Sequence, residues 1–211
     1  MRILVVAATA MEVAPIVRRL GCANPATLQR ECPAEAPAAR RPRVTRHEYA
    51  GHGVDVLLTG IGMVATAAWC SRALAETRYD LALNLGVCGS FDRALEPGCV
   101  VHVVSDRLAE LVNVAPPSNA ALTRLPAVRG ITVNTAHGNE RSIAAVVRRF
   151  QPQVESMEGA AFMYACLIHD LPFAQVRAVS NIVARRNRQA WRVADAISAL
   201  STVAMTLVDT L

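Results

Sequence analysis

The chain has 211 residues, of which 53% are hydrophobic and 18% are charged, and its formal net charge is +5. This length suits one domain with a sizeable core, and so apolar a composition favours an α/β protein with buried parallel strands. All 22 basic residues are arginines, and they are scattered along the chain rather than gathered with aromatic residues. That distribution argues against a nucleic-acid-binding surface.

The six cysteines form no C-x-x-C pair, and none has a histidine at metal-ligand spacing. A zinc site is therefore not expected. Several cysteines lie inside apolar runs, which favours reduced thiols in a cytoplasmic protein. The N-terminal apolar run is soon followed by acidic Glu12, so it predicts a strand rather than a signal peptide. No apolar run reaches the roughly 18 residues of a membrane span.

The first segments predict a strand and a capped helix. A β-branched apolar run covers residues 2–8 and favours a central strand. Thr9 and Glu12 follow with the spacing of a capping box, which also presents the Glu12 carboxylate at the carboxyl end of that strand. Residues 22–46 carry four prolines and five arginines with little periodicity. They predict an exposed irregular excursion.

Two later strands are followed by glycine pairs. Residues 44–49 and 54–59 predict a hairpin, after which Gly60-Ile61-Gly62 opens a helix that extends to residue 75. Residues 80–85 predict another strand, which runs into a turn that begins at Gly86. Such glycines let the backbone approach a ligand closely, or they simply make a tight connection. No third glycine or acidic residue completes a dinucleotide-binding fingerprint.

The next part of the chain predicts a strand over residues 98–104 and an irregular loop over residues 108–126 that covers a site. A short strand at 130–134 and a helix at 140–150 follow, with the polar exit of the strand between them. The histidine in that exit, His137, is more typical of a hydrogen-bonded structural residue than of a catalyst.

The closing helix is predicted over residues 189–211, with one apolar side. That side is formed by Trp191, Ala194, Ile197 and Leu200. Together the segments predict a single domain, residues 1–211, with a mixed three-layer α/β fold in which helices flank the sheet.

The sequence around Met157 places polar side chains where a ligand-binding site is expected. Glu155 and Glu158 flank this methionine where a short extended run meets a helix of small residues. A buried strand over residues 171–179 then ends in Ser180 and Asn181. Polar groups at the carboxyl ends of strands are where α/β sheets keep their sites. The alternative is that Glu158 only favours the first turn of its helix.

These segments resemble the purine nucleoside phosphorylase and nucleosidase superfamily. The resemblance lies in Met11-Glu12, the run from Thr59 to Gly62, the glycine run from Asn84 to Ser90, the run from Glu155 to Ala161, and the run from Val176 to Asn181. Within the superfamily, the runs 84–91, 134–140 and 179–181 are most similar to those of the futalosine hydrolases.

The resemblance implies hydrolysis of the N-glycosidic bond of futalosine, which releases hypoxanthine in a step of menaquinone biosynthesis. Glu12 matches the carboxylate that activates water, Glu158 the one that grips the ribose hydroxyls, and Asn181 the residue that assists the leaving base. Further substrate contacts are implied for Met157, Gly86, Ser180, Ile61 and Gly62. The resemblance also implies no metal or organic cofactor, a small purine nucleoside as substrate, and a homodimer or higher homo-oligomer.

Two departures decide between the alternatives. Nucleosidases for 6-aminopurines carry an aspartate as general acid where this chain has Asn181, whose amide donates a hydrogen bond to a 6-oxopurine instead. Phosphorylases usually have a hydroxyl residue where this chain has Val87. A methylthioadenosine-type nucleosidase and a phosphorylase are thus weaker alternatives. A non-catalytic nucleoside-binding protein is a third, because the loop over residues 105–126 is short and has no aromatic residue.

Overall fold

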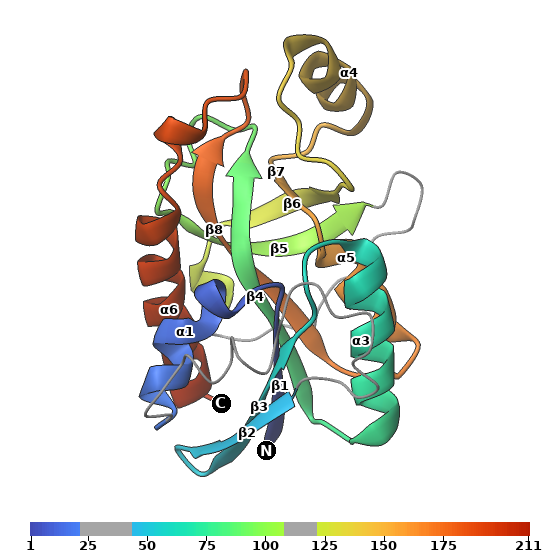
Figure 1. Cartoon of the computed structure of the whole chain (residues 1–211), viewed down its shortest axis with the longest axis vertical. Coiled ribbons are helices and arrows are strands. Elements are labelled where there is room, and N and C mark those ends of the chain that lie inside the picture. The colour runs from blue at the N-terminus through green and yellow to red at the C-terminus, as the bar shows by residue number, and fades with distance from the viewer. Residues whose placement is uncertain (22–43, 108–121) are drawn as a thin grey trace.

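The computed structural model describes residues 1–21, 44–107 and 122–211 (Figure 1). Strands and helices alternate through much of this part, and the helices flank a mixed sheet, which confirms the predicted α/β class. The strands are β1 (Arg2–Ala7), β2 (Val44–Tyr49), β3 (His52–Leu58), β4 (Leu81–Ser90), β5 (Val100–Arg107), β6 (Ala127–Thr132), β7 (Val154–Ser156) and β8 (Phe173–Ile182). The helices are α1 (Ala10–Arg19), α3 (Met63–Glu76), α4 (Glu140–Phe150), α5 (Gly159–Leu167) and α6 (Val193–Asp209).

The described strands form one sheet in the order β2-β3-β1-β4-β7-β6-β5-β8, and β4 also pairs with β8. β1 is parallel to both β3 and β4, and β4 is parallel to β8. The β2–β3 pair is the predicted antiparallel hairpin. Because β8 returns to β4, strands β4, β7, β6, β5 and β8 close into a ring. The carboxyl ends of β1, β3, β4 and β8 meet at one end of the sheet.

Two apolar cores lie on opposite faces of the sheet. Side chains alternate along β1, so that Ile3 and Val5 enter one core while Leu4 and Val6 enter the other. The first core includes the buried faces of α1 and α6, and the second includes those of α3 and α5. Figure 1 shows the two helix pairs on either side of the central strands. Full burial of each such side chain stabilises the fold by roughly 1.5–3 kcal/mol.

The glycine run after residue 85 was predicted as a turn, and that prediction was wrong. β4 continues to Ser90, because Gly86 pairs with Arg177 of β8 and Gly89 pairs with both Asn181 and Glu155. A register shift between Cys88 and Gly89 marks a bulge in the β4–β8 pair. The predicted polar pair, Ser180 and Asn181, lies at the end of β8, which closes at Ile182.

The closing helix begins four residues later than predicted. α6 starts at Val193, so Trp191 lies outside it, and Ala194 is exposed. The buried face includes the predicted Ile197 and Leu200, together with Ala196, Ala204, Met205, Leu207 and Val208. Arg188–Asp209 is long and apolar enough to cross a membrane by length and composition alone, but this buried face is that of a core helix.

Two predicted segments fall largely outside the described residues. Of the excursion predicted at 22–46, only residues 44–46 are described, and they begin β2. Of the loop predicted at 105–126, residues 105–107 belong to β5, and residues 122–124 form a short 3-10 turn.

Candidate active site

A cavity of about 290 Å³ lies where the strand ends meet. Six of the eight predicted site residues line it: Glu12, Ile61, Met157, Glu158, Ser180 and Asn181. Cys88, His137, Glu155 and Trp191 line it too. The cavity therefore gathers carboxylates, an amide and aromatic rings from segments far apart in the sequence, which is the pattern of a small-molecule site.

Glu12 reaches the cavity from the first turn of α1 while it also caps that helix. Its Oε2 accepts hydrogen bonds from the Thr9 backbone N–H at 2.9 Å and from the Thr9 hydroxyl at 3.0 Å. Its Oε1 accepts from the Val87 N–H at 3.2 Å. Both predicted readings of the Thr9–Glu12 spacing, a cap and a carboxylate at the strand end, therefore hold.

Burial raises the pKa of Glu12 above its usual range. The Arg177 guanidinium and the Val87 hydrogen bond oppose this shift, while the charge of Glu158 adds to it. A carboxyl whose pKa is moved toward neutrality is a better proton acceptor at physiological pH than an ordinary glutamate.

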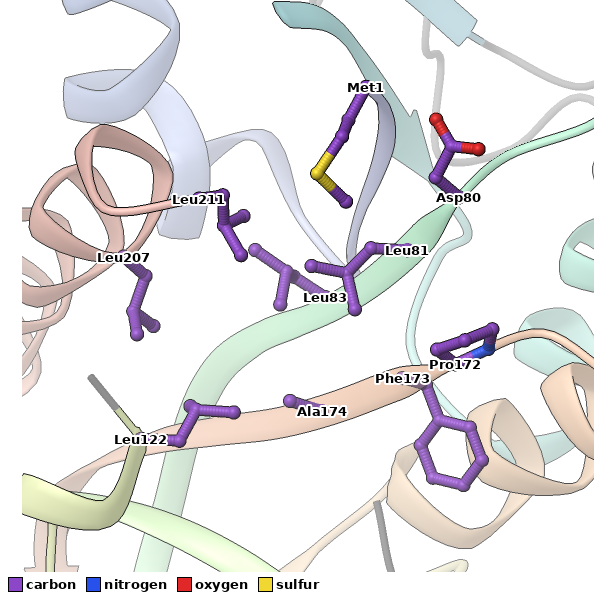
Figure 2. Close-up of a pocket in the computed structure, with 10 residues that line it drawn as sticks. All are labelled: Met1, Asp80, Leu81, Leu83, Leu122, Pro172, Phe173, Ala174, Leu207 and Leu211. Carbon is purple, nitrogen blue, oxygen red and sulfur yellow. The ribbon is translucent and has the colours of Figure 1, made fainter. Parts of the chain in front are cut away.

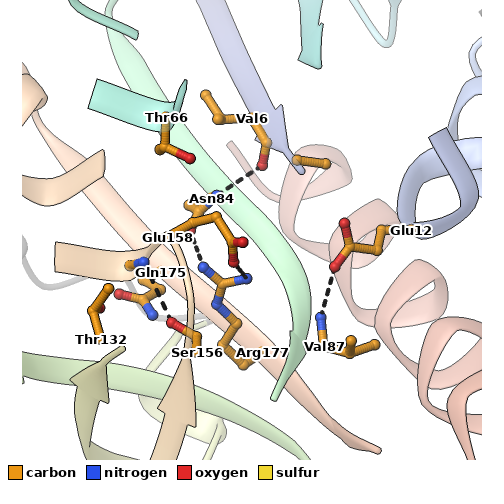
Figure 3. A network of polar contacts seen from close by, with 12 residues as sticks. Val6, Glu12, Thr66, Asn84, Val87, Thr132, Ser156, Glu158, Gln175 and Arg177 are labelled. Atoms are coloured by element: carbon orange, nitrogen blue, oxygen red, sulfur yellow. Dashed lines mark hydrogen bonds and ion pairs between the residues drawn. The ribbon is translucent and has the colours of Figure 1, made fainter. Parts of the chain in front are cut away.

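Glu158 lies where β7 passes into α5 and is tied to two other elements. Its Oε1 accepts from the Gly62 N–H at 3.1 Å, and its Oε2 lies 3.7 Å from Arg177 Nη1. Arg177 is only 1% exposed and also donates to Asn84 Oδ1. Figure 3 shows this guanidinium beside both Glu158 and Asn84, and it shows the hydrogen bond from Val87 to Glu12.

Gly86 and Gly62 support the carboxylates and do not line the cavity. A Cβ at Gly86 would overlap Arg177 Nη1 and lie 2.8 Å from Glu12 Oε1. Glycine is thus needed at residue 86 so that the arginine and the carboxylate can both pack against β4. Gly62 has a φ of 101° and directs its N–H to Glu158. Direct contact of both glycines with the substrate, which the family resemblance implies, stays a prediction.

The side-chain amide of Asn181 is oriented by its neighbours. The Ser180 hydroxyl lies 2.8 Å from Asn181 Oδ1, and Asn181 Nδ2 donates to the Ile182 carbonyl at 3.3 Å. The Ser180 hydroxyl also lies 3.1 Å from the Cys88 carbonyl, so the amide is oriented by Nδ2 facing the Ile182 carbonyl, which leaves the second N–H of Nδ2 for a ligand. The amide is therefore set up as a donor toward the cavity.

Sequence reasoning missed the pairing of His137 with Glu155. Glu155 Oε2 lies 2.6 Å from His137 Nδ1, and Glu155 Oε1 accepts from the His137 backbone N–H at 3.0 Å. Burial raises the pKa of Glu155, and the histidine opposes this shift. The two residues are 18 positions apart, and no local spacing indicates that they meet.

Trp191 was also missed as a site residue, because it was assigned to the apolar side of the closing helix. It lies between a short 3-10 turn and α6. The next residue, Arg192, donates its N–H to the Ser180 carbonyl at 2.8 Å, which holds this segment against the end of β8. Trp191 therefore supplies the cavity with an aromatic ring. The sequence of the 105–126 loop contains no aromatic residue that could do so.

Cys88 does not have the charge of a nucleophile. Burial raises the pKa of its thiol to about 12, so it remains protonated. Among the described residues, no group of three or more histidine, cysteine, aspartate or glutamate side chains is arranged to hold a metal ion.

A second cavity, of about 250 Å³, contrasts with the first (Figure 2). Leucine, alanine, proline, phenylalanine and methionine make up nine of its ten lining residues. The tenth, Asp80, accepts a hydrogen bond from the Arg2 N–H at 2.6 Å. This cavity brings together no pair of acid–base groups, so the first one is the candidate active site.

A family model described as the phosphorylase superfamily matches residues 2–131. The chain is 31% identical over 178 residues to the futalosine hydrolase of Thermus thermophilus, covering 72% of this chain and 79% of that protein. It is 30% identical over 202 residues to the futalosine hydrolase of Streptomyces coelicolor, covering 82% and 85%. The chain belongs to the futalosine hydrolase family of the phosphorylase superfamily.

Solved structures share the fold at lower identity. A methylthioadenosine/S-adenosylhomocysteine nucleosidase from Colwellia psychrerythraea, in complex with adenine, has a TM-score of 0.82 at 21% identity and covers 100% of this chain and 96% of its own. The futalosine hydrolase of Helicobacter pylori has a TM-score of 0.80 at 15% identity and covers 100% and 98%. This member of the futalosine hydrolase family thus has the same architecture as both nucleosidases.

Proposed function

We propose that this protein hydrolyses the N-glycosidic bond of futalosine and releases hypoxanthine. The observation that carries the proposal is the placement of Glu12, Glu158 and Asn181 in one cavity, each held by protein hydrogen bonds. The identity of about 30% to two futalosine hydrolases supports the choice of substrate.

The carboxylates have separate roles in the proposed reaction. Glu12, whose pKa is raised by burial, accepts a proton from the attacking water. Glu158 accepts hydrogen bonds from the ribose hydroxyls and offers negative charge to the ribosyl ring as it becomes oxocarbenium-like. Met157 packs against the sugar. Arg177 holds Glu158 in place and partly offsets the repulsion between the two glutamates.

The base end of the cavity favours a 6-oxopurine. Asn181 presents an N–H, and the N7 and O6 atoms of hypoxanthine are both acceptors. The hydrogen bond from Asn181 Nδ2 to the Ile182 carbonyl supports this orientation. Trp191 lines the same cavity and offers aromatic surface to the purine. A 6-aminopurine would bring its own donors against the Asn181 N–H.

We also propose a pathway, a compartment and an oligomeric state for the enzyme. The reaction is a step of menaquinone biosynthesis in the cytoplasm, and the enzyme is a single-domain protein that works as a homodimer or larger homo-oligomer. Large apolar side chains exposed on and beside α3 and α5 support the last point: Ile61, Val64, Tyr164, Leu167 and Ile168.

The test is hypoxanthine release from futalosine, with inosine and methylthioadenosine in parallel and with phosphate present or omitted. We expect release from futalosine at a rate that phosphate does not change. Phosphate-dependent release would replace hydrolysis with phosphorolysis. Tight futalosine binding without turnover would leave a nucleoside-binding protein.

The second candidate is a methylthioadenosine-type nucleosidase, because a relative of that name in Lysinibacillus sphaericus is 28% identical over 173 residues. Adenine release from methylthioadenosine by the wild-type protein would favour it. If Asn181 sets base preference, Asn181→Asp gains activity on the 6-aminopurine substrate and loses activity on futalosine. An unchanged preference would contradict this role of Asn181.

A further inference from the structure

Asn181 leaves one chemical requirement of the proposed function unmet. When the glycosidic bond breaks, its electron pair stays on the purine, and the departing base is stabilised most by receiving a proton. A carboxamide donates a hydrogen bond but does not give up a proton at ordinary pH. A group with a transferable proton is therefore needed at the base end of the cavity.

The imidazole ring of His137 lines the cavity and has its Nε2 left for a ligand. Its Nδ1 is bonded to Glu155 Oε2 at 2.6 Å, and its backbone N–H is bonded to the other oxygen of the same carboxylate. Its edge contacts Phe91, with ring centroids 6.0 Å apart. The described residues provide no hydrogen-bond partner for Nε2. The ring is thus held on one side and open on the other.

The pairing of β4 places this histidine–carboxylate pair beside Asn181. Gly89 pairs with Glu155 of β7 on one side and with Asn181 of β8 on the other. A Cβ at Gly89 would lie 3.3 Å from Asn181 Nδ2 and 3.5 Å from Glu155 Cγ. Glu12, in contrast, bonds to Val87, two positions earlier on β4 and so roughly 7 Å away along the strand. Glu155 and Glu12 therefore serve different ends of the cavity.

Among the described residues, Glu155 is the charged group that is bonded to the ring. The thiol of Cys88 is buried and protonated. Arg186 packs its aliphatic carbons against Gly138, and its backbone N–H bonds to the Gly138 carbonyl at 3.1 Å, but its side chain is exposed. The buried Glu155 carboxylate is the nearest charge and is opposite in sign to a protonated imidazole.

We propose that His137 is the general acid of the reaction and that Glu155 is its positioning residue. As the bond between C1′ and N9 breaks, its electrons pass to the purine, and His137 Nε2 gives its proton to purine N7. The oxygen of water bonds to C1′, and Glu12 takes the proton that water loses. Solvent then returns a proton to His137 and removes one from Glu12. The inference rests on the proposed nucleosidase function.

The first test compares two leaving groups in His137→Gln. Inosine and futalosine need a proton at N7, whereas 7-methylinosine leaves as a neutral base without one. We expect kcat on the unmethylated substrates to fall about 10²–10⁴-fold, while kcat on 7-methylinosine changes less than threefold. Equal losses on both kinds of substrate would overturn the proposal. His169→Gln, at an exposed histidine, is the matched control.

Glu155→Gln tests positioning, since the amide keeps an oxygen for His137 but loses the charge. We expect kcat on futalosine to fall while kcat on 7-methylinosine changes little, because the ring is held less firmly but the contacts to the ribose remain. Equal losses on both substrates would indicate a structural role only and would contradict the assignment.

A binding measurement separates failure of this inference from failure of the proposed function. Hypoxanthine added to protein with ¹⁵N-labelled histidine should shift the Nε2 resonance of His137, whether or not the protein turns over futalosine. The resonance is assigned by its loss in His137→Gln. An unshifted Nε2 with hypoxanthine bound would overturn the inference even in an active enzyme.

Discussion

At the scale of single residues, Glu12 links the fold to the chemistry. The same carboxylate caps α1 through Thr9 and faces the cavity from beside Val87. Its position follows from the short connection between β1 and α1, which is why the capping-box spacing located it correctly. Glu158, the second carboxylate of the cavity, is held instead by Gly62 and Arg177. These two residues lie outside its own segment, so no local spacing indicates its position.

Glu12→Gln should remove the proton acceptor for water and keep much of the hydrogen bonding. We expect kcat for hypoxanthine release to fall about 10²–10⁴-fold with a smaller change in KM. Glu76→Gln, on the exposed end of α3, should leave kcat unchanged. Activity of the Glu12 variant within threefold of wild type would remove this residue from the mechanism.

The pH profile should report the same group. Because burial raises the pKa of Glu12, the fraction ionised falls as pH decreases through a range above that of an ordinary glutamate. The acid limb of kcat/KM should lie correspondingly high and should disappear from the residual activity of Glu12→Gln. An acid limb retained unchanged in the variant would assign it to another residue.

At the scale of elements, the junction between β7 and α5 is packed tightly against two buried polar side chains. A Cβ at Gly159 would overlap Asp106 Oδ2 and Gln175 Nε2. Asp106 Oδ1 accepts from the Thr132 hydroxyl at 2.9 Å, and Thr132 Oγ1 in turn accepts from the Ala160 N–H at 2.8 Å. The start of α5, which carries Glu158, is therefore fixed by a buried network.

Gly159→Ala should destabilise the protein by about 1–3 kcal/mol, because backbone or side chains must move to admit the methyl group. For a chain of this size that corresponds to a fall in Tm of roughly 2–12 °C by calorimetry. Gly53→Ala is the control, since a Cβ there meets nothing closer than 3.7 Å. Equal Tm values for the two variants would show that the junction is loosely packed.

Asp106 should make stability depend on pH. Burial raises its pKa to about 6 from an unperturbed 3.8, so ionising it costs more in the folded than in the unfolded state. Its contribution to stability is therefore full below about pH 4 and is lost as pH rises toward 6 and beyond. Asp106→Asn removes this dependence and keeps an acceptor for the Thr132 hydroxyl.

The variant should consequently gain on the order of 1–3 kcal/mol over wild type in urea unfolding at pH 8, and little at pH 4. Part of that gain reflects Gln175 Oε1, which has no hydrogen-bond partner among the described residues and can accept from the new amide once Gln175 turns over. A difference between variant and wild type that is the same at both pH values would contradict the pKa shift.

At the scale of the whole molecule, the elements whose bounds depend on neighbouring residues in the sequence were predicted correctly. The bounds of α4 match the prediction, because Asn139 caps its start through the Ser142 N–H and Gln151 ends it with a φ of 47°. The β2–β3 hairpin and the strand β1 also follow from local pattern. Glu12, Glu158 and Asn181, which the family resemblance singles out, line one cavity, and their roles stay predictions.

The remaining features depend on contacts between distant segments. β4 continues through Gly86 because β8 pairs with it, and no local pattern reveals the partner of Gly86, Arg177, in a strand much later in the sequence. The closing of the strands into a ring, the approach of His137 to Glu155, and the position of Trp191 before α6 have the same cause. Each is set by tertiary pairing rather than by the periodicity of its own segment.

The exposed apolar side chains around α3 and α5 bear on assembly. Val64 is 83% exposed and Ile168 is 56% exposed, so a charge at Val64 costs an isolated subunit little. We expect the wild-type protein to be a dimer or larger by light scattering, and Val64→Glu to shift it toward monomer. Ala194→Glu on α6 is the matched control. A monomeric wild type would contradict the proposed assembly.

The most direct test of the central claim is the identity of the sugar product that the wild-type protein forms from futalosine in phosphate buffer, measured by mass spectrometry. Activation of water by Glu12 predicts hypoxanthine and the free sugar in equal amounts, with no sugar 1-phosphate. A sugar 1-phosphate as the main product would show that phosphate is the nucleophile and would contradict the hydrolytic account of this cavity.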